Sequence, residues 1–137
     1  MRYAPLDNYK DQVLLVARIL LMILFIQFGW SKLTGFPGTV GMMTAIGLPS
    51  PTVAAIIAVV CEFFVGIAIV LGFLTRPLAL LLALYTLATA FIGHHYWTLT
   101  GTEHMENLIN FYKNISITGG LLLLGLTGPG KYSIDRG

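Results

Sequence analysis

Four stretches of this 137-residue chain are long and apolar enough to cross a lipid bilayer as helices. A membrane-spanning helix needs about 20 largely apolar residues. The stretches that meet this length are residues 13–33, 52–74, 77–97 and 108–126. Because 56% of the residues are hydrophobic and only 10% are charged, against about 25% charged in soluble domains, the sequence predicts an all-α integral membrane protein. We expect residues 1–137 to form a single domain, an antiparallel four-helix transmembrane bundle.

The segments between the apolar stretches predict how the helices connect. Only Thr75 and Arg76 separate the second stretch from the third, and Pro77 suits the start of a helix. These two helices should therefore form an antiparallel hairpin. The longer link, residues 34–51, is rich in Gly, Pro and Met, a composition that fits either a short interfacial helix or a plain loop.

Basic residues near the ends of the apolar stretches predict the orientation. With four spans, one side of the membrane receives five of them: Arg2, Lys10, Arg76, Lys131 and Arg136. The other side has Lys32, and its last loop contains two glutamates and no Lys or Arg. Because cytoplasmic loops are enriched in Lys and Arg, we expect both termini to be cytoplasmic.

Four charged residues lie inside the predicted spans, where a charge costs about 2.5 to 3.5 kcal/mol on insertion scales. Counted at about 1.5 Å per residue, Arg18 lies in the inner third and Glu62 near the midplane. Lys113 and Lys32 lie in the outer half. By depth, Lys113 is the nearest partner for Glu62, and Arg18 is the alternative. We expect Lys32 to reach toward the headgroups as an interfacial residue. An internal ion pair of this kind either fixes helix register or belongs to a functional site.

Helical spacing predicts which sides of the first two spans face protein. Intervals of three and four residues place one set on a single stripe of the first span: Arg18, Met22, Phe25, Gly29 and Lys32. On the second span, small and apolar residues that permit close helix packing surround Glu62: Ala55, Ala58, Gly66 and Ile69. We therefore expect Glu62 to face protein and not lipid.

Polar groups gather in the outer half of the predicted bundle. All four helices contribute to this set: Gln27, Glu62, His94, Asn110 and Lys113, with His95 and Asn114 beside them. A scaffold does not need such an asymmetry, so we expect a binding cavity there, with Glu62, Lys113 and the histidines as proton-handling groups. Three small residues leave room for a flat ring: Ala58, Gly66 and Ala90. Met42 and Met43 could cover it, because methionine adapts its shape readily.

Several classes of site are excluded or weakly supported by the sequence. Cys61 is the only cysteine, so neither a disulfide nor a paired-thiol redox motif can form within the chain. The spacing of His94, His95 and His104 matches no metal-binding pattern, and no second membrane helix supplies a histidine for haem. No motif for a flavin or a nucleotide is present, and a net charge of +2 does not indicate nucleic acid. The identity of any cofactor therefore stays open.

Taken together, short motifs along nearly the whole chain resemble those of the DoxX family of small bacterial membrane proteins. They are FGWSKL at 28–33, LGFLTRP at 71–77, GHHYW at 93–97, NFYKN at 110–114 and GPGKYSID at 128–135, together with Arg18 and Glu62. The last of these is the most specific, and its Gly-Pro pair is typical of a helix end. The resemblance implies a four-helix fold in the bacterial inner membrane and a general oxidoreductase assignment. It also implies a link to quinones, since relatives are associated with quinone-coupled thiosulfate oxidation, thiol and oxidative stress, and resistance to catechols and quinones.

Three functions fit these observations. The first is a redox accessory that holds a quinone or another small hydrophobic molecule beside Glu62 and Lys113. The second is a small-solute transporter or permeability factor, which would favour a homo-oligomer because four helices enclose only a narrow path. The third is a non-catalytic assembly subunit for a membrane redox partner, whose polar residues only join helices. All three require the lipid bilayer as the surrounding medium.

Overall fold

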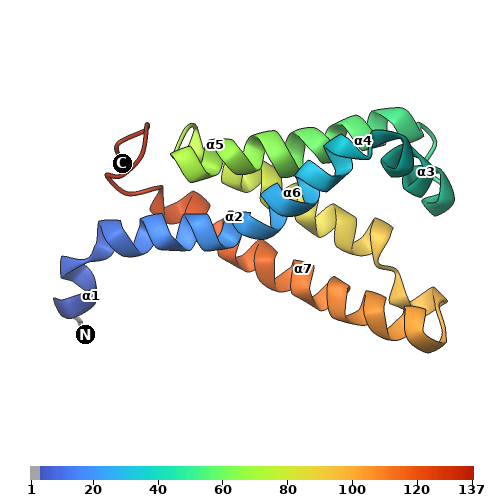
Figure 1. The fold of residues 1–137 in the computed structure, drawn as a ribbon. Coiled ribbons are helices and arrows are strands. Elements are labelled where there is room, and N and C mark those ends of the chain that lie inside the picture. The colour runs from blue at the N-terminus through green and yellow to red at the C-terminus, as the bar shows by residue number, and fades with distance from the viewer. Residues whose placement is uncertain (1–3) are drawn as a thin grey trace.

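Every regular element of the described chain is helical. The computed structural model describes residues 4–137, so Arg2, one of the residues used to predict the topology, lies outside the described residues. The elements are α1 (Ala4–Asn8), α2 (Lys10–Thr34), α3 (Phe36–Ile46), α4 (Pro51–Val59), a π-helical turn η1 (Val60–Phe64), α5 (Val65–Leu71), α6 (Thr75–Gly93), a 3-10 turn η2 (Tyr96–Thr98) and α7 (Gly101–Thr127) (Figure 1). The all-α class is confirmed, since residues 4–137 contain no strand.

Three helical segments within residues 4–137 are long and apolar enough to cross a membrane. They are Lys10–Thr34, Pro51–Leu71, which joins α4, η1 and α5, and Thr75–Thr98. These correspond to the first three predicted stretches. The fourth, residues 108–126, lies inside α7, which is 27 residues long. Helix α7 is less apolar because Asn110, Lys113 and Asn114 interrupt its sequence.

The link between the first two spans contains a helix. Of the two alternatives for residues 34–51, the structure has the short helix, α3. Gly47, with a φ of 88°, ends it, and glycine adopts this left-handed conformation without steric cost. Pro51 then starts α4 at a position where its missing N–H is not needed.

The turn between α5 and α6 lies slightly earlier than the sequence indicates. Helix α5 ends at Leu71, because Gly72 has a φ of 74° and terminates it. Helix α6 already begins at Thr75. The predicted boundaries at residues 74 and 77 are therefore shifted, since apolar residues 73–74 continue the hydrophobic run without continuing the helix. The predicted hairpin is present, and α6 runs back along α5 (Figure 1).

The C-terminal tail folds back against this turn. Asp135 donates its backbone N–H to the Gly72 carbonyl at 2.9 Å. Its carboxylate accepts hydrogen bonds from the amides of Leu74 at 2.9 Å and Thr75 at 2.8 Å. The bond from the Thr75 amide is the main reason that the pKa of Asp135 lies below its usual range. The tail thus supplies partners for backbone amides at the start of α6, which the helix itself leaves unpaired.

The long helical segments pack as two pairs. Helix α2 lies against the continuous helix Pro51–Leu71, and α6 lies along α7. Figure 1 shows both described ends of the chain at one end of the molecule, with α2 and α7 diverging toward the other. We call the half near the termini the proximal half and the other the distal half. The proximal half has a continuous core whose fully buried members include Met22, Ile69, Leu82 and Leu121.

Candidate functional site

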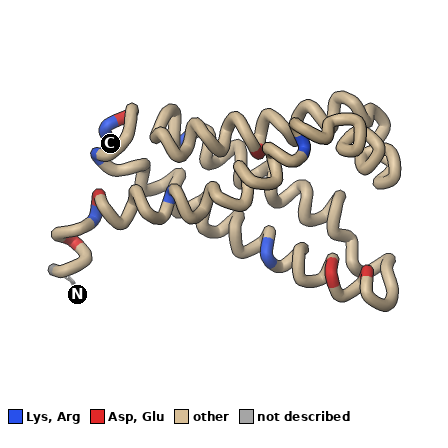
Figure 2. The backbone as a smooth tube through the Cα atoms, in the orientation of Figure 1, with Lys and Arg blue, Asp and Glu red and all other residues tan. Residues whose placement is uncertain are grey.

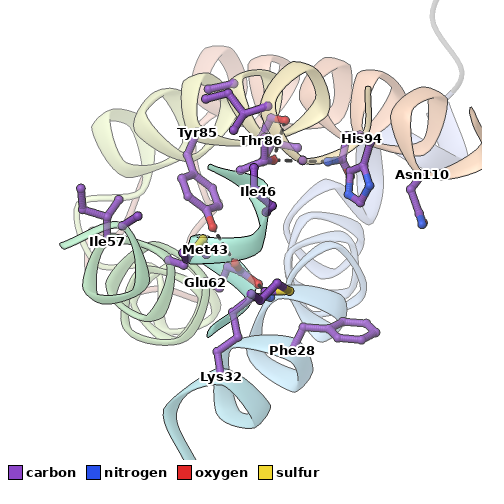
Figure 3. Close-up of a pocket in the computed structure, with 18 of the residues that line it drawn as sticks. Phe28, Lys32, Met43, Ile46, Ile57, Glu62, Tyr85, Thr86, His94 and Asn110 are labelled. Atoms are coloured by element: carbon purple, nitrogen blue, oxygen red, sulfur yellow. Dashed lines mark hydrogen bonds and ion pairs between the residues drawn. The ribbon is translucent and has the colours of Figure 1, made fainter. Parts of the chain in front are cut away.

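A cavity of about 610 Å³ lies in the distal half, between the two helix pairs. One wall comes from α2, α3 and the Pro51–Leu71 helix, and the other from α6 and α7 (Figure 3). Most lining side chains are apolar. The polar ones are Lys32, Glu62, Tyr85, Thr86, Thr89, His94, Asn110, Lys113 and Asn114. We call this space the distal cavity. Four of the five residues around which the sequence predicts a cavity line it: Glu62, His94, Asn110 and Lys113.

Glu62 reaches the cavity from the π-helical turn η1. Such turns are rare and occur mostly as single bulges within α-helices, often at functional sites. Here the backbone of α2 approaches the turn closely, because a Cβ built on Gly29 would lie 2.5 Å from the amide nitrogen of Phe63. Only a glycine permits this contact. Glu62 itself is 7% exposed, which confirms that it faces protein.

Three different helices meet at the Glu62 carboxylate. Lys32 Nζ donates to Oε1 at 2.8 Å, forming an ion pair. The Tyr85 hydroxyl donates to Oε2 at 2.6 Å. Both carboxylate oxygens therefore have a donor, which a buried charge requires to be tolerated. The Lys32 ammonium also lies 5.9 Å from the centre of the Phe28 ring, within the range of a cation–π contact.

The predicted partner of Glu62 was wrong. The ion pair uses Lys32, which was expected to be an interfacial residue, and not Lys113 or Arg18. The physical reason is the approach of α2 at Gly29, because Lys32 follows Gly29 by three residues and shares its stripe. Its long side chain then reaches across to the carboxylate. The depth of a residue along its own helix does not show how closely that helix approaches another.

Lys113 lies on the far wall of the cavity. Its ammonium donates to Asn110 Oδ1 on the same helix at 3.0 Å, and its side chain is exposed. Because α7 diverges from α2 in this half of the molecule, Lys113 stays on the α7 side. Deeper along α7, Asn114 is buried and donates to the Thr89 hydroxyl at 3.3 Å. The α6 and α7 wall thus carries amide and hydroxyl groups and one lysine ammonium.

The two neighbouring histidines of the GHHYW motif have different surroundings. His94 lines the cavity, and its Nδ1 lies 3.0 Å from Asn107 Oδ1. His95 is not among the lining residues, and its Nδ1 lies 2.6 Å from the Thr98 hydroxyl. Of these two histidines, therefore, only His94 can contact a molecule in the cavity.

Among residues 4–137 no three His, Cys, Asp or Glu side chains lie close enough together to hold a metal ion.

Arg18 belongs to the proximal half. It is fully buried, and its guanidinium donates to the carbonyl oxygens of Ile69 and Tyr132. It therefore does not pair with Glu62, and the prediction of Arg18 as the alternative partner is wrong. Instead it joins α2 to the end of α5 and to the C-terminal tail. Its role in the structure is to close the proximal end.

Gln27 does not contribute to the cavity. It is exposed on the side of α2 away from the buried stripe, so its inclusion in the predicted cavity was wrong. Two of the small residues expected to make room, Gly66 and Ala90, also do not line the space: Gly66 packs against Phe25 and Ile26 of α2, and Ala90 is fully buried. Ala58 does line it, and so does the predicted methionine cover on α3, Met42 and Met43.

Tyr85 and Thr89 are the main site residues that the sequence analysis missed. Both lie on α6, four residues apart, so they share one face of that helix. Two polar side chains four residues apart inside an apolar span indicate a polar stripe on one face of the helix, and this pattern could have predicted them. Neither is charged, and tyrosine and threonine are common in apolar helices, so their presence alone did not indicate a site.

The sequence of this chain is similar to those of known proteins. A family model described as DoxX matches residues 13–95, which include Lys32, Glu62, Tyr85 and His94. The residues of α7 that form the far wall lie beyond this match. No solved structure matches the chain significantly.

Full-length relatives cover α7 as well. Inner membrane protein YphA of Escherichia coli is 54% identical over 136 residues, which are 99% of this chain and 97% of that protein. Inner membrane protein YqjF of the same organism is 49% identical over 131 residues, 96% of this chain and 95% of that protein. The ER-derived vesicles protein ERV29 of Saccharomyces cerevisiae is 31% identical over 95% of this chain, but these residues cover only 35% of ERV29.

Proposed function

We propose that this chain, which belongs to the DoxX family and is a multi-pass protein of the bacterial inner membrane, is a redox accessory that binds a quinone-like ring. The distal cavity is the observation that carries this proposal. Its volume of about 610 Å³ falls within the usual range for small-molecule sites, about 300 to 1,000 Å³. Mostly apolar walls with a few polar groups suit a flat, amphipathic molecule drawn from the membrane.

The polar groups support proton exchange with such a ring. Quinones take up protons together with electrons, so a site for them benefits from groups that hold and release protons. Glu62, whose side-chain oxygens accept hydrogen bonds from Lys32 and Tyr85, supplies one such group on the first wall. His94 and Lys113 supply others on the second wall. We assign the electrons to a partner redox protein, because the chain itself offers no redox motif.

The proposal includes four spans with both termini cytoplasmic, in one domain comprising residues 1–137. Helix α7 is about 40 Å long at about 1.5 Å per residue, which is enough to cross the bilayer beside α6. The polar residues of α7 that line the distal cavity, Asn110, Lys113 and Asn114, face the cavity and not lipid in this arrangement. Figure 2 shows Lys and Arg together with acidic residues at the end where both termini lie, and acidic residues near the start of α7; Lys10, Arg76, Lys131 and Arg136 are the basic residues near the helix ends on the side of the termini. This distribution supports a cytoplasmic proximal end.

The packing of the proximal half favours this function over a transport path. In the proximal half, the buried side chains of Met22, Leu82 and Leu121 fill the space between the helices. Arg18 and the C-terminal tail cover the end. A solute path through one copy would have to displace this core. A pure assembly subunit, in turn, would not need a cavity of this size.

The test is competitive photolabelling of the purified protein in lipid nanodiscs with a photoreactive quinone. We expect labelled peptides from α2 near Phe28, from η1 and from α7, and we expect excess decylubiquinone to abolish the labelling. Asn110→Leu, which removes an amide from the cavity wall, should lower the labelling several-fold. Gln27→Leu is the matched control, because it removes an amide of similar kind that lies outside the cavity.

Two results would contradict the proposal. One is labelling spread evenly over lipid-facing positions, or labelling that excess decylubiquinone does not reduce. The other is an equal loss in Asn110→Leu and Gln27→Leu. Either result would leave the assembly role as the better account.

A further inference from the structure

We infer that Asn107 is a positioning residue that holds His94 with its proton on Nδ1, so that the distal cavity prefers a ring bearing hydroxyl groups over its carbonyl counterpart. This inference rests on the proposed function and specifies the chemical class of the ligand. Asn107 lies near the start of α7 and does not line the cavity. Its effect on the ligand is therefore exerted through His94.

The side-chain amide of Asn107 has one orientation that satisfies both of its contacts. One end lies 2.9 Å from the backbone oxygen of Glu103. A carbonyl oxygen only accepts hydrogen bonds, so this end is the Nδ2 amino group. The other end, Oδ1, lies 3.0 Å from His94 Nδ1. Because an amide oxygen also only accepts, the proton in this bond belongs to His94 Nδ1.

This arrangement fixes what His94 offers to the cavity. A neutral imidazole with its proton on Nδ1 has a lone pair on Nε2. His94 lines the cavity and Asn107 does not, so the Nδ1 edge is occupied by a group outside the cavity. Nε2 is the ring nitrogen that remains for the ligand. His94 therefore presents a hydrogen-bond acceptor.

The opposite wall also presents an acceptor. Figure 3 shows Glu62 and His94 on different sides of the cavity. The Glu62 oxygens accept from Lys32 and Tyr85, and a carboxylate retains further lone pairs after two such bonds. A ring with hydroxyl groups at both ends can donate to both walls. A ring with carbonyl groups there would direct lone pairs at lone pairs.

Donors in the cavity limit this effect to a preference. Lys113 donates one N–H to Asn110 Oδ1, Lys32 donates one to Glu62 Oε1, and both ammonium groups keep others, so a carbonyl ring still finds partners. One hydrogen bond gained by the hydroxyl form corresponds to about a tenfold difference in affinity. The cavity should therefore bind a quinol about tenfold more tightly than the matching quinone.

The first measurement needs no ligand. Nitrogen NMR of the protein with isotope-labelled histidine, in lipid, should show His94 as the tautomer protonated on Nδ1. Asn107→Leu should abolish this preference, whereas Asn107→Asp should keep it, because a carboxylate oxygen still accepts from Nδ1. A tautomer protonated on Nε2 in the unmodified protein would overturn the inference. So would an unchanged His94 signal in Asn107→Leu.

The second measurement compares decylubiquinol with decylubiquinone, the quinol being kept reduced without oxygen. The preference for the quinol should fall to near unity in Asn107→Leu and persist in Asn107→Asp. His95→Gln is the control and should leave the preference unchanged, because His95 lies outside the cavity. Equal affinities in the unmodified protein would overturn the ligand class while leaving the proposed function intact. Absence of binding by both rings would overturn the ligand class and the proposed function together.

Discussion

At the scale of single residues, the carboxylate of Glu62 organises the site. It carries a charge in an apolar interior and is stabilised by an ammonium from α2 and a phenol from α6. Removing one member of a buried ion pair leaves the other without compensation. Lys32 and Glu62 should therefore depend on each other, which replaces the expectation that Lys32 is an independent interfacial residue.

A double-mutant cycle tests this dependence. Lys32→Met and Glu62→Gln should each lower the free energy of unfolding, and the double variant should lose less than the sum. We expect a coupling of about 0.5 to 3 kcal/mol, as for contacting residues in general. Unfolding in mixed detergent micelles measures it. The same cycle with Lys113→Met should give a coupling near zero, and a larger value there than for Lys32 would contradict the assigned pair.

At the scale of elements, the contact between α2 and η1 decides where the charged residues meet. The absence of a side chain at Gly29 lets the two backbones touch at Phe63. Small residues at helix interfaces allow such approach within membranes. The π-helical turn η1 and Gly29, which lies opposite it on α2, together bring Glu62 within reach of Lys32.

Adding one methyl group tests this contact. Gly29→Ala would place a Cβ 2.5 Å from a backbone nitrogen, so α2 must move away. We expect a loss of about 1 to 3 kcal/mol, typical of overpacking, together with a weaker Lys32–Glu62 coupling. Gly119→Ala on α7 is the matched control, because its Cβ meets nothing within 4 Å. It should be neutral or stabilising by up to about 1 kcal/mol, and equal losses in both variants would contradict this account.

At the scale of the whole molecule, the two ends differ in construction. The proximal end is closed by a packed core, by Arg18 and by the tail, whereas the distal end contains the cavity. Hydrogen bonds hold the C-terminal tail against the helices. The Asp135 carboxylate accepts from the Leu74 amide, and the backbone N–H of Lys131 donates to Asp11 Oδ1 at 2.9 Å. The start of α2 and the C-terminal tail thus lie together at the proximal end.

Cysteine labelling tests the proposed orientation of these ends. In a Cys61→Ala background, a cysteine at Thr102 should react with an impermeant thiol reagent added to intact spheroplasts. A cysteine at Ile134, which is 60% exposed, should react only after the membrane is opened. The expectation follows from the excess of basic residues at the proximal end. Reaction at Ile134 in intact spheroplasts would reverse the orientation.

The sequence by itself determined the helical class, three of the spans and the buried stripes, because these follow from composition and from the helical repeat. The stripe of Arg18, Met22, Phe25 and Gly29 is buried as its spacing predicts. The pairing of Glu62 was decided only by the tertiary structure. It depends on how closely two helices approach and where they diverge, and a period along one helix does not specify the distance to another. The contact at Gly29 brings Lys32 to Glu62, and the divergence of α7 from α2 keeps Lys113 away and leaves the cavity between them.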